Sequence, residues 1–249
     1  MPARRPRPPR DVEGLLARLR RAIPVPFCEL RASSPWELLV ATVLAARSTD
    51  RTANEVTARL LARWPTPAAL AGADLRDVED VVRSSGYYRQ KARALRALAA
   101  CLVERHGGEV PRAMDELVEL PGVGRKTANV VLGTAFGVAE GIIVDTHSGR
   151  VARRLGLATA TDPDGIERQL CAHVDRTQWI ETGHRLTLHG RYVCLARKPR
   201  CADCPLQELC PSAAAPPAHR DWKRRADDEW RHILAPAQTG PDAPLATAG

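Results

Sequence analysis

The sequence contains no apolar run long enough to cross a membrane. Its longest run, Leu38 to Ala46, has nine residues and includes Thr42, whereas a spanning helix needs roughly 20. The first ten residues are rich in arginine and proline and precede no apolar stretch, so they do not form a secretory signal. We therefore expect a cytoplasmic protein, in which disulfide bonds are rare.

Lysine and aromatic residues are both scarce. Of the 37 basic residues only four are lysines, so each one merits inspection for a specific role: Lys91, Lys126, Lys198 and Lys223. Aromatic residues make up 4% of the chain and leave few surfaces for stacking. The net charge of +8, with a pI of about 9.5, suggests a polyanionic partner.

The periodicity and capping signals predict helices almost everywhere in the 249 residues. We expect helices after the capping box Ser34-Pro35-Trp36-Glu37, over 50–63, after Thr66-Pro67, from Asp74 to near Gly86, and over 87–106, 115–120, 126–136, 145–156, 163–174 and 180–192. Only Gly141 to Val144 resembles a strand, and it is too short and isolated to form a sheet. The prediction is an all-α protein with two lobes and a tail at each end, the second containing a weak helical signal over 221–234.

A glycine-containing turn joins two of the expected helices. Gly122 and Gly124 in Leu120-Pro121-Gly122-Val123-Gly124-Arg125-Lys126-Thr127 permit positive φ and close approach of the backbone. The helix that follows starts with N–H groups that lack helical partners and could bind a phosphate oxygen. An ordinary helix–turn–helix corner explains the same residues, whereas a P-loop does not, because no strand precedes the turn.

Lys126 and Asp145 are the candidate chemical groups. The helix dipole disfavours a cation at Lys126 by about 0.3–1 kcal/mol, and the adjacent Arg125 adds repulsion, so both favour the neutral, nucleophilic amine. An ordinary surface lysine, the commoner case, is the alternative. Asp145 follows the apolar segment 141–144 and is placed to cap a helix, a role that needs no catalysis. A carboxylate held rigidly beside a reaction centre is the functional alternative, and both roles can coexist.

Four of the seven cysteines cluster in the pattern C-x6-C-x2-C-x5-C: Cys194, Cys201, Cys204 and Cys210, the cluster cysteines. Such thiolates bind zinc or an iron–sulfur cluster, but zinc sites usually pair two C-x2-C units and only one is present. The first interval contains the loop cations Arg197, Lys198 and Arg200, which would present a basic surface. The isolated cysteines Cys28, Cys101 and Cys171 are expected to be buried apolar residues.

Together these segments resemble endonuclease III, a base-excision DNA glycosylase family of the helix-hairpin-helix superfamily, from about residue 30 to 212. The resemblance rests on Leu120-Pro-Gly-Val-Gly-Arg-Lys-Thr-Ala-Asn129, on Val144-Asp-Thr-His147, and on Leu188-His-Gly-Arg-Tyr-Val-Cys-Leu-Ala-Arg-Lys-Pro-Arg-Cys201 with the two further cysteines. It implies a basic tail at 1–10, an N-terminal helix at 11–30 that packs with the cluster lobe, a six-helix barrel over 31–139, a cluster lobe over 140–212 and a largely disordered tail over 213–249.

The resemblance also implies roles for individual residues. Lys126 and Asp145 match the catalytic lysine and aspartate, and the cluster cysteines match the ligands of a [4Fe–4S] cluster. The candidate contacts to damaged double-stranded DNA are Gly122, Val123, Gly124, Arg125, Arg47, Tyr87, His147, Arg197, Lys198 and Arg200. The implied protein is a monomeric, nucleoid-associated DNA glycosylase and abasic-site lyase that removes oxidised pyrimidines.

This chain departs from the family's pattern at three places. Arg47 replaces the usual Gln on the loop that fills the gap left by the extruded base, Tyr87 stands where Leu is frequent, and Ser148-Gly149 replaces bulky apolar residues. Three other functions fit these residues less well. An adenine-mismatch glycosylase lacks the lysine and usually carries a further C-terminal domain, a non-catalytic DNA-binding module would have lost Lys126 or Asp145, and a zinc-binding regulator would be colourless.

Overall fold

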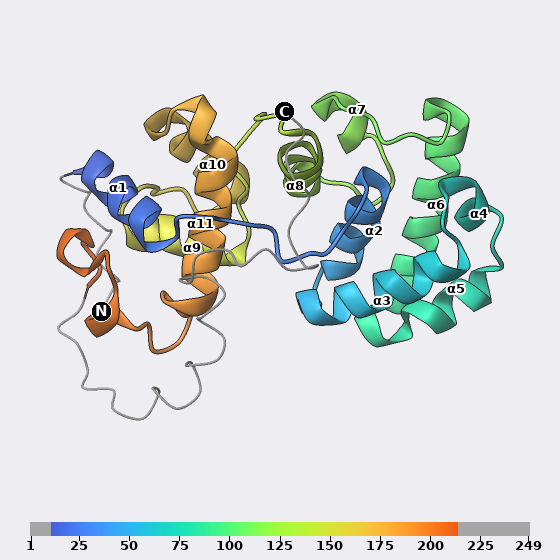
Figure 1. The fold of residues 1–249 in the computed structure, drawn as a ribbon, viewed down its shortest axis with the longest axis horizontal. Helices are drawn as coiled ribbons and strands as arrows, with labels where there is room; N and C mark the ends of the chain where they lie inside the picture. The colour runs from blue at the N-terminus through green and yellow to red at the C-terminus, as the bar shows by residue number, and fades with distance from the viewer. Residues whose placement is uncertain (1–10, 214–249) are drawn as a thin grey trace. The chain divides into compact units, whose positions relative to one another are not determined.

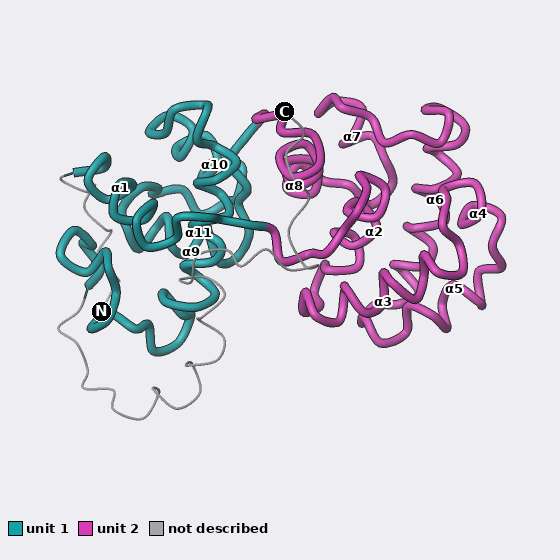
Figure 2. The backbone as a smooth tube through the Cα atoms, in the orientation of Figure 1, with its two compact units in different colours: residues 1–27, 141–241 teal, residues 28–140, 242–249 magenta. Residues whose placement is uncertain are grey.

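Helices account for all the regular secondary structure in residues 11–213, the part of the chain that the computed structural model describes (Figure 1). No strand occurs in that part, so the all-α prediction is confirmed. The weak helix predicted over 221–234 lies outside the described residues. The described chain divides into two units, shown in Figure 2: unit 1 has residues 11–27 and 141–213, and unit 2 has residues 28–140.

Unit 2 is built around a helix that is apolar on all sides. This helix, α2 (Pro35–Ala45), buries every residue from Leu38 to Leu44 and packs against α3, α6 and α8. The unit's helices are α2, α3 (Asp50–Arg63), α4 (Pro67–Ala71), α5 (Leu75–Val82), the 3-10 turn η1 (Arg83–Ser85), α6 (Tyr88–His106), α7 (Met114–Val118) and α8 (Arg125–Phe136). The capping box at Ser34 predicted the start of α2, because the Ser34 side chain accepts a bond from the first turn. In α3 the Thr49 side chain forms the same kind of cap, which was not predicted from the sequence.

Unit 1 joins an N-terminal helix to the second half of the chain. Its elements are α1 (Val12–Ala22), α9 (Thr146–Arg154), α10 (Pro163–His173), η2 (Arg176–Gln178), α11 (Trp179–Tyr192), η3 (Cys201–Asp203) and η4 (Gln207–Leu209). Leu15, Leu16 and Leu19 of α1 enter the same core as residues of α9, α10 and α11. Thus α1 belongs to the core of the unit that contains the cysteine pattern.

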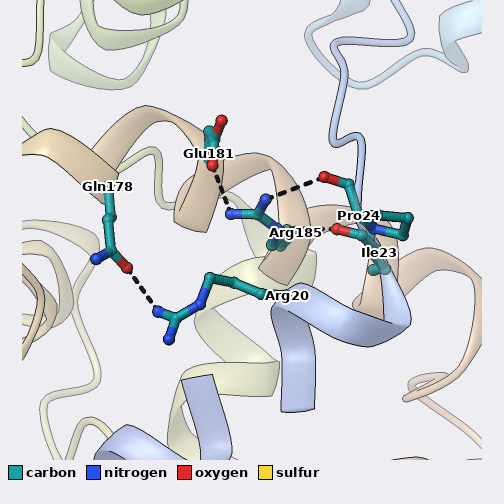
Figure 3. A network of polar contacts seen from close by, with 6 residues as sticks. All are labelled: Arg20, Ile23, Pro24, Gln178, Glu181 and Arg185. Carbon is teal, nitrogen blue, oxygen red and sulfur yellow. Dashed lines mark hydrogen bonds and ion pairs between the residues drawn. The ribbon is translucent and has the colours of Figure 1, made fainter. Parts of the chain in front are cut away.

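A buried arginine fixes the end of α1 (Figure 3). Arg185 of α11 is 5% exposed and donates hydrogen bonds to the carbonyl oxygens of Ile23 at 2.9 Å and Pro24 at 3.2 Å. It also pairs with Glu181 at 2.8 Å, while Arg20 bonds Gln178 at 2.7 Å. These bonds hold the last residues of α1 just before the chain leaves unit 1 after residue 27.

Two expectations from the sequence need correction. The helix expected over 11–30 ends at Ala22, because Pro24 and Pro26 cannot continue a helix. The short helix expected from Asp115 begins at Met114. The expectation that segment 141–144 forms no sheet is confirmed, because it has no partner strand among the described residues and is buried without regular structure.

Candidate functional site

The glycine turn of unit 2 leads directly into α8. Gly122 has a φ of 79°, and a Cβ atom there would lie 3.3 Å from the Cβ of Ala94, so glycine suits both the backbone and the space. Gly124 is the N-cap of α8 and has no side chain to accept from the first-turn N–H groups. Val123 is buried and closes the turn with a bond from its N–H to the Leu120 carbonyl at 3.1 Å. The turn therefore points an uncapped helix start outward.

Lys126 is the second residue of α8, and its side chain is exposed. The exposed Arg125 precedes it, so two cationic side chains lie at the positive end of the helix dipole. Lys126 belongs to unit 2, whereas Asp145 belongs to unit 1.

Asp145 is the N-cap of α9 and forms a reciprocal capping box. Its Oδ1 atom accepts the N–H groups of His147 at 2.8 Å and Ser148 at 2.7 Å, and the Ser148 hydroxyl at 3.1 Å. The Asp145 N–H in turn donates to the Ser148 Oγ at 2.8 Å. No residue of the described chain donates to Oδ2. One carboxylate oxygen therefore fixes the orientation of the group while the other stays available for chemistry.

Ser148 and Gly149, which depart from the family's bulky apolar residues, have different surroundings in unit 1. Ser148 is fully buried, and its hydroxyl contacts both Asp145 and the Ile143 carbonyl, a role that an apolar residue cannot fill. A Cβ atom on Gly149 would lie 3.4 Å from side chains of Ile166 and Val144. The Ser148 side chain therefore belongs to the capping arrangement around Asp145, whereas Gly149 packs beside Ile166 and Val144.

The α9 helix also packs closely against α11. A Cβ atom on Gly190 of α11 would lie 2.9 Å from the Cβ of His147, so only glycine permits this approach. His147 is half-buried, and burial is the main reason that its pKa is lowered, with the neighbouring Arg191 and Arg150 charges acting in the same direction. The imidazole is therefore neutral near pH 7.

Arg47 and Tyr87, predicted for two separate loops, contact each other in unit 2. The Arg47 guanidinium donates to the Tyr87 hydroxyl at 2.9 Å and lies 5.1 Å from the centre of the ring. Both residues have positive φ, 55° and 49°, which is uncommon for non-glycine residues. Both are exposed, Tyr87 by 56%. The sequence did not predict that they would meet.

The cluster cysteines line one cavity of about 220 Å³ in unit 1. The cavity walls also include Leu155, His189 and Arg200. No three His, Cys, Asp or Glu side chains in the described residues converge on a position for a single ion. Four thiols that line one cavity are a ligand set that a four-iron cluster can use.

Burial favours the protonated form of three of these thiols. It raises the pKa of Cys204 to about 12 and raises the pKa values of Cys201 and Cys210 as well. Iron binding requires thiolates, so the positive charge of the metal must displace these protons. His189, which is 1% exposed, lies 3.7 Å from the Cys204 sulfur, and burial lowers its pKa to about 4.

Two arginines connect α9 to the first cluster cysteine. Arg150 donates to the carbonyl oxygens of Gly190 at 2.7 Å and Cys194 at 3.1 Å. Arg154 reaches the Cys194 sulfur at 3.3 Å and the Leu195 carbonyl at 2.6 Å. The helix that Asp145 caps therefore also holds the loop that starts at Cys194.

The loop cations differ in exposure. Arg197 and Lys198 are exposed, and Lys198 has a φ of 53°. Arg200 is half-buried, and its side chain lines the cysteine cavity. Its N–H bonds the Val193 carbonyl at 3.0 Å and closes the loop. The expected basic surface therefore rests on two of the three cations.

Several residues that hold these arrangements in place were not predicted as functional. They are Ser148, Arg150, Arg154, Gly190 and Lys91, whose buried amine donates to the Leu44 and Ser85 carbonyls of unit 2. Lys91 carried a usable signal, because it lies on the apolar face of its helix, with Leu95 four residues and Leu98 seven residues further on. The partners of Arg150 and Arg154 lie about 40 residues away in the sequence. No local pattern reveals contacts at that separation.

Comparison with known proteins agrees with this geometry. Residues 40–175 match the HhH-GPD superfamily base excision DNA repair proteins, and residues 194–210 match the iron–sulfur binding domain of endonuclease III. The second match begins and ends on cluster cysteines. The chain therefore contains an iron–sulfur domain of the [4Fe–4S] type found in endonuclease III.

Curated relatives and solved structures cover most of the chain. Endonuclease III of Synechocystis is 46% identical over 81% of this chain and 92% of its own length, and that of Escherichia coli K12 is 44% identical over 79% and 92%. A structure of a trapped endonuclease III–DNA covalent intermediate matches with a TM-score of 0.79 and 43% identity, over 82% of this chain and 95% of that one. This chain belongs to the endonuclease III family within the HhH-GPD superfamily.

Proposed function

We propose that the protein is a bifunctional DNA glycosylase and abasic-site lyase of base excision repair that removes oxidised or saturated pyrimidines from duplex DNA. The observation that carries this proposal is the pair of candidate groups. An exposed lysine stands at an uncapped helix start, and a carboxylate is oriented through one oxygen. Relatives with 40–46% identity are named endonuclease III, and one solved relative was trapped as a covalent intermediate with DNA.

The reaction begins after the damaged nucleotide is extruded, because its C1′ atom cannot be reached within the base stack. The neutral Lys126 Nζ attacks C1′ and forms a C–N bond, while the glycosidic bond breaks and its electron pair leaves with the base. The Asp145 carboxylate stabilises the positive charge that develops on the sugar. Its Oδ2 atom is suited to this role because Oδ1 already holds three donors.

Strand cleavage follows from the same covalent link. The sugar ring opens to a Schiff base between Lys126 and C1′, which acidifies the proton on C2′. Loss of that proton breaks the bond between C3′ and its oxygen, and the 3′ phosphate departs with the electron pair. Hydrolysis of the Schiff base then releases Lys126 as an amine.

Other residues bind DNA or hold the site in place. The glycine turn from Gly122 to Arg125 contacts a backbone phosphate, while the Val123 N–H stays bonded to the Leu120 carbonyl, and the exposed Arg197 and Lys198 contact other phosphates. Arg47 and Tyr87 fill the space left by the extruded nucleotide. The cluster cysteines would hold the [4Fe–4S] cluster, which would link the loop from Cys194 to Cys210 as a structural crosslink.

The two units divide this work. The region over 31–139 supplies the lysine and the glycine turn, and the region over 140–212, with the segment 11–30 that includes α1, supplies Asp145 and the cluster cysteines. A single chain contributes both candidate groups, so the protein acts as a monomer. No helix among the described residues is sufficiently long and apolar to cross a membrane. The proposed substrate places the protein at the nucleoid.

The test uses duplexes that each carry one defined lesion, with base release and strand cleavage scored separately. Borohydride reduces a Schiff base, so the wild-type protein should form a covalent adduct with DNA, and Lys126→Ala should lose both the adduct and the cleavage. Lys223→Ala, a lysine outside the described residues, is the control and should keep both. An adduct that persists in Lys126→Ala would contradict the assignment, and base release without any cleavage would indicate a monofunctional glycosylase.

A further inference from the structure

Lys91 is hydrogen-bonded to the backbone just before two separate loops of unit 2, residues 46–48 and 86–88. It is the fourth residue of α6, is 6% exposed, and donates from Nζ to the carbonyl oxygens of Leu44 at 2.8 Å and Ser85 at 2.7 Å. Leu44 lies in the last turn of α2, where carbonyls lack helical partners. Ser85 is the last residue of η1 and is itself buried. One buried amine therefore satisfies a backbone carbonyl beside each of the two loops.

These two loops carry the Arg47–Tyr87 pair. Arg47 follows Leu44 by three residues, and Tyr87 follows Ser85 by two. Both adopt positive φ, a conformation that persists in non-glycine residues only where the surroundings enforce it. The contact between the two side chains is exposed, and exposed charged contacts contribute little by themselves. The buried bonds of Lys91 are therefore the stronger constraint on both loops.

The surroundings of Lys91 support a specific role for the amine. The residue lies on the apolar face of α6, where a leucine or methionine would pack without any burial cost for a charge. Its hydrogen-bond partners lie 47 and 6 residues away, at the ends of α2 and η1, each just before one of the two loops. An apolar side chain would fill the volume but would leave both buried carbonyls without this donor.

We propose that Lys91 is a positioning residue that fastens the two loops, so that Arg47 and Tyr87 form a single preassembled wedge before DNA is bound. This inference rests on the proposed function, in which the pair fills the space left by the extruded nucleotide. A preformed pair enters the duplex without first ordering two side chains and two loops, which is the general advantage of preorganisation. Lys91 itself touches no DNA and acts only through the loops.

The first experiment measures the loops in the DNA-free protein. Amide hydrogen exchange at residues 46–48 and 86–88 should become faster in Lys91→Met, because both loops lose their shared donor. Arg93→Met is the matched control, since Arg93 is an exposed cation on the same helix, and its exchange at these positions should equal that of the wild type. Unchanged exchange in Lys91→Met would overturn the proposal. This readout does not depend on any enzymatic activity.

The second experiment measures single-turnover base excision and the fluorescence of a base analogue placed beside the lesion, which reports unstacking. Lys91→Met should lower both rates by roughly tenfold to a hundredfold, as expected when a positioning contact is lost. In an Arg47→Ala, Tyr87→Ala background the same substitution should produce no further decrease. An equal decrease in both backgrounds would show a general structural role and overturn the proposal.

A replacement variant and a readout that is independent of activity keep the proposal testable. Where Lys91→Met does not fold, Lys91→Gln, which keeps a neutral N–H donor group on a shorter side chain, replaces it in the same cycle. It should give an intermediate decrease that also disappears in the double-alanine background. A wild-type protein without excision on any lesion would contradict the proposed function, while hydrogen exchange would still decide whether Lys91 fastens the loops.

Discussion

Asp145→Asn separates the structural and chemical roles that one carboxylate carries. The structure assigns the structural role to Oδ1, which accepts three hydrogen bonds from His147 and Ser148. An asparagine oxygen can accept the same three bonds, and its amide group then occupies the place of Oδ2. The cap geometry survives, and only the negative charge near the N-terminus of α9 is lost. That charge contributes about 0.3–1 kcal/mol to the free energy of unfolding.

The expected effect on catalysis is much larger. Removing a preorganised charge that stabilises a transition state costs about 2.7–4 kcal/mol, or roughly a hundredfold to a thousandfold in rate. Single-turnover excision from a lesion-bearing duplex should therefore slow by that factor, whereas DNA binding should change little, because phosphate contacts supply most of the affinity. The thermal midpoint should fall by only a few degrees, at about 2–4 °C per kcal/mol for a chain of this size.

Asp145→Ala provides the comparison, because it removes the cap as well as the charge. Its thermal midpoint should fall further than that of Asp145→Asn, by the additional ~1 kcal/mol of a lost cap, while its excision rate should be similarly low. Wild-type excision by Asp145→Asn would refute the assignment of the charge to catalysis. If the asparagine variant unfolds, the idea that Oδ1 alone sustains the cap is wrong.

Three further predictions follow from the site. Replacing Arg197 and Lys198 with alanine should reduce the slope of log affinity against log salt by roughly 0.9 per lost phosphate contact, equally for damaged and undamaged DNA. The half-buried Arg200 should add less, and an unchanged slope would exclude the loop from binding. The purified protein should be brown and contain about four irons. Replacing any cluster cysteine with serine should reduce the colour or the solubility, whereas the isolated cysteines should tolerate the same change. A colourless, zinc-loaded and fully active protein would contradict this prediction. Burial lowers the pKa of Lys91 from 10.5 to about 8, so between these values the unfolded chain binds more protons than the folded one and stability rises with pH. The free energy of unfolding should rise by at most about 3 kcal/mol across this range. Thermal unfolding at pH 7.5 and 9.5 should show part of this rise in the wild type and not in Lys91→Met. An equal pH response of the two proteins would contradict the prediction.

The sequence predicts the helices best where the signal is local. Ser34, Thr66, Asp74 and Asp145 each cap the helix that follows within three residues, so a short window contains the whole interaction. The boundaries of α3 agree with the prediction for the same reason. The cysteine spacing and the glycine turn are equally local, and their chemistry follows from residue type and interval. The segment 141–144 forms no sheet, as its length predicted, and its apolar run belongs to a buried segment without regular structure.

Only the tertiary structure revealed how the site is held. Lys91 bonds Leu44 across 47 residues, Arg154 reaches Cys194 across 40, and Arg185 reaches Ile23 across 162. A sequence pattern contains the donor but not the distant carbonyl that needs it, because helix packing decides which backbone groups remain without partners. The division of labour between the two oxygens of Asp145 also depends on where Ser148 is buried. The sequence therefore determined which groups could react, and the packing of the helices decided how each one is oriented and restrained.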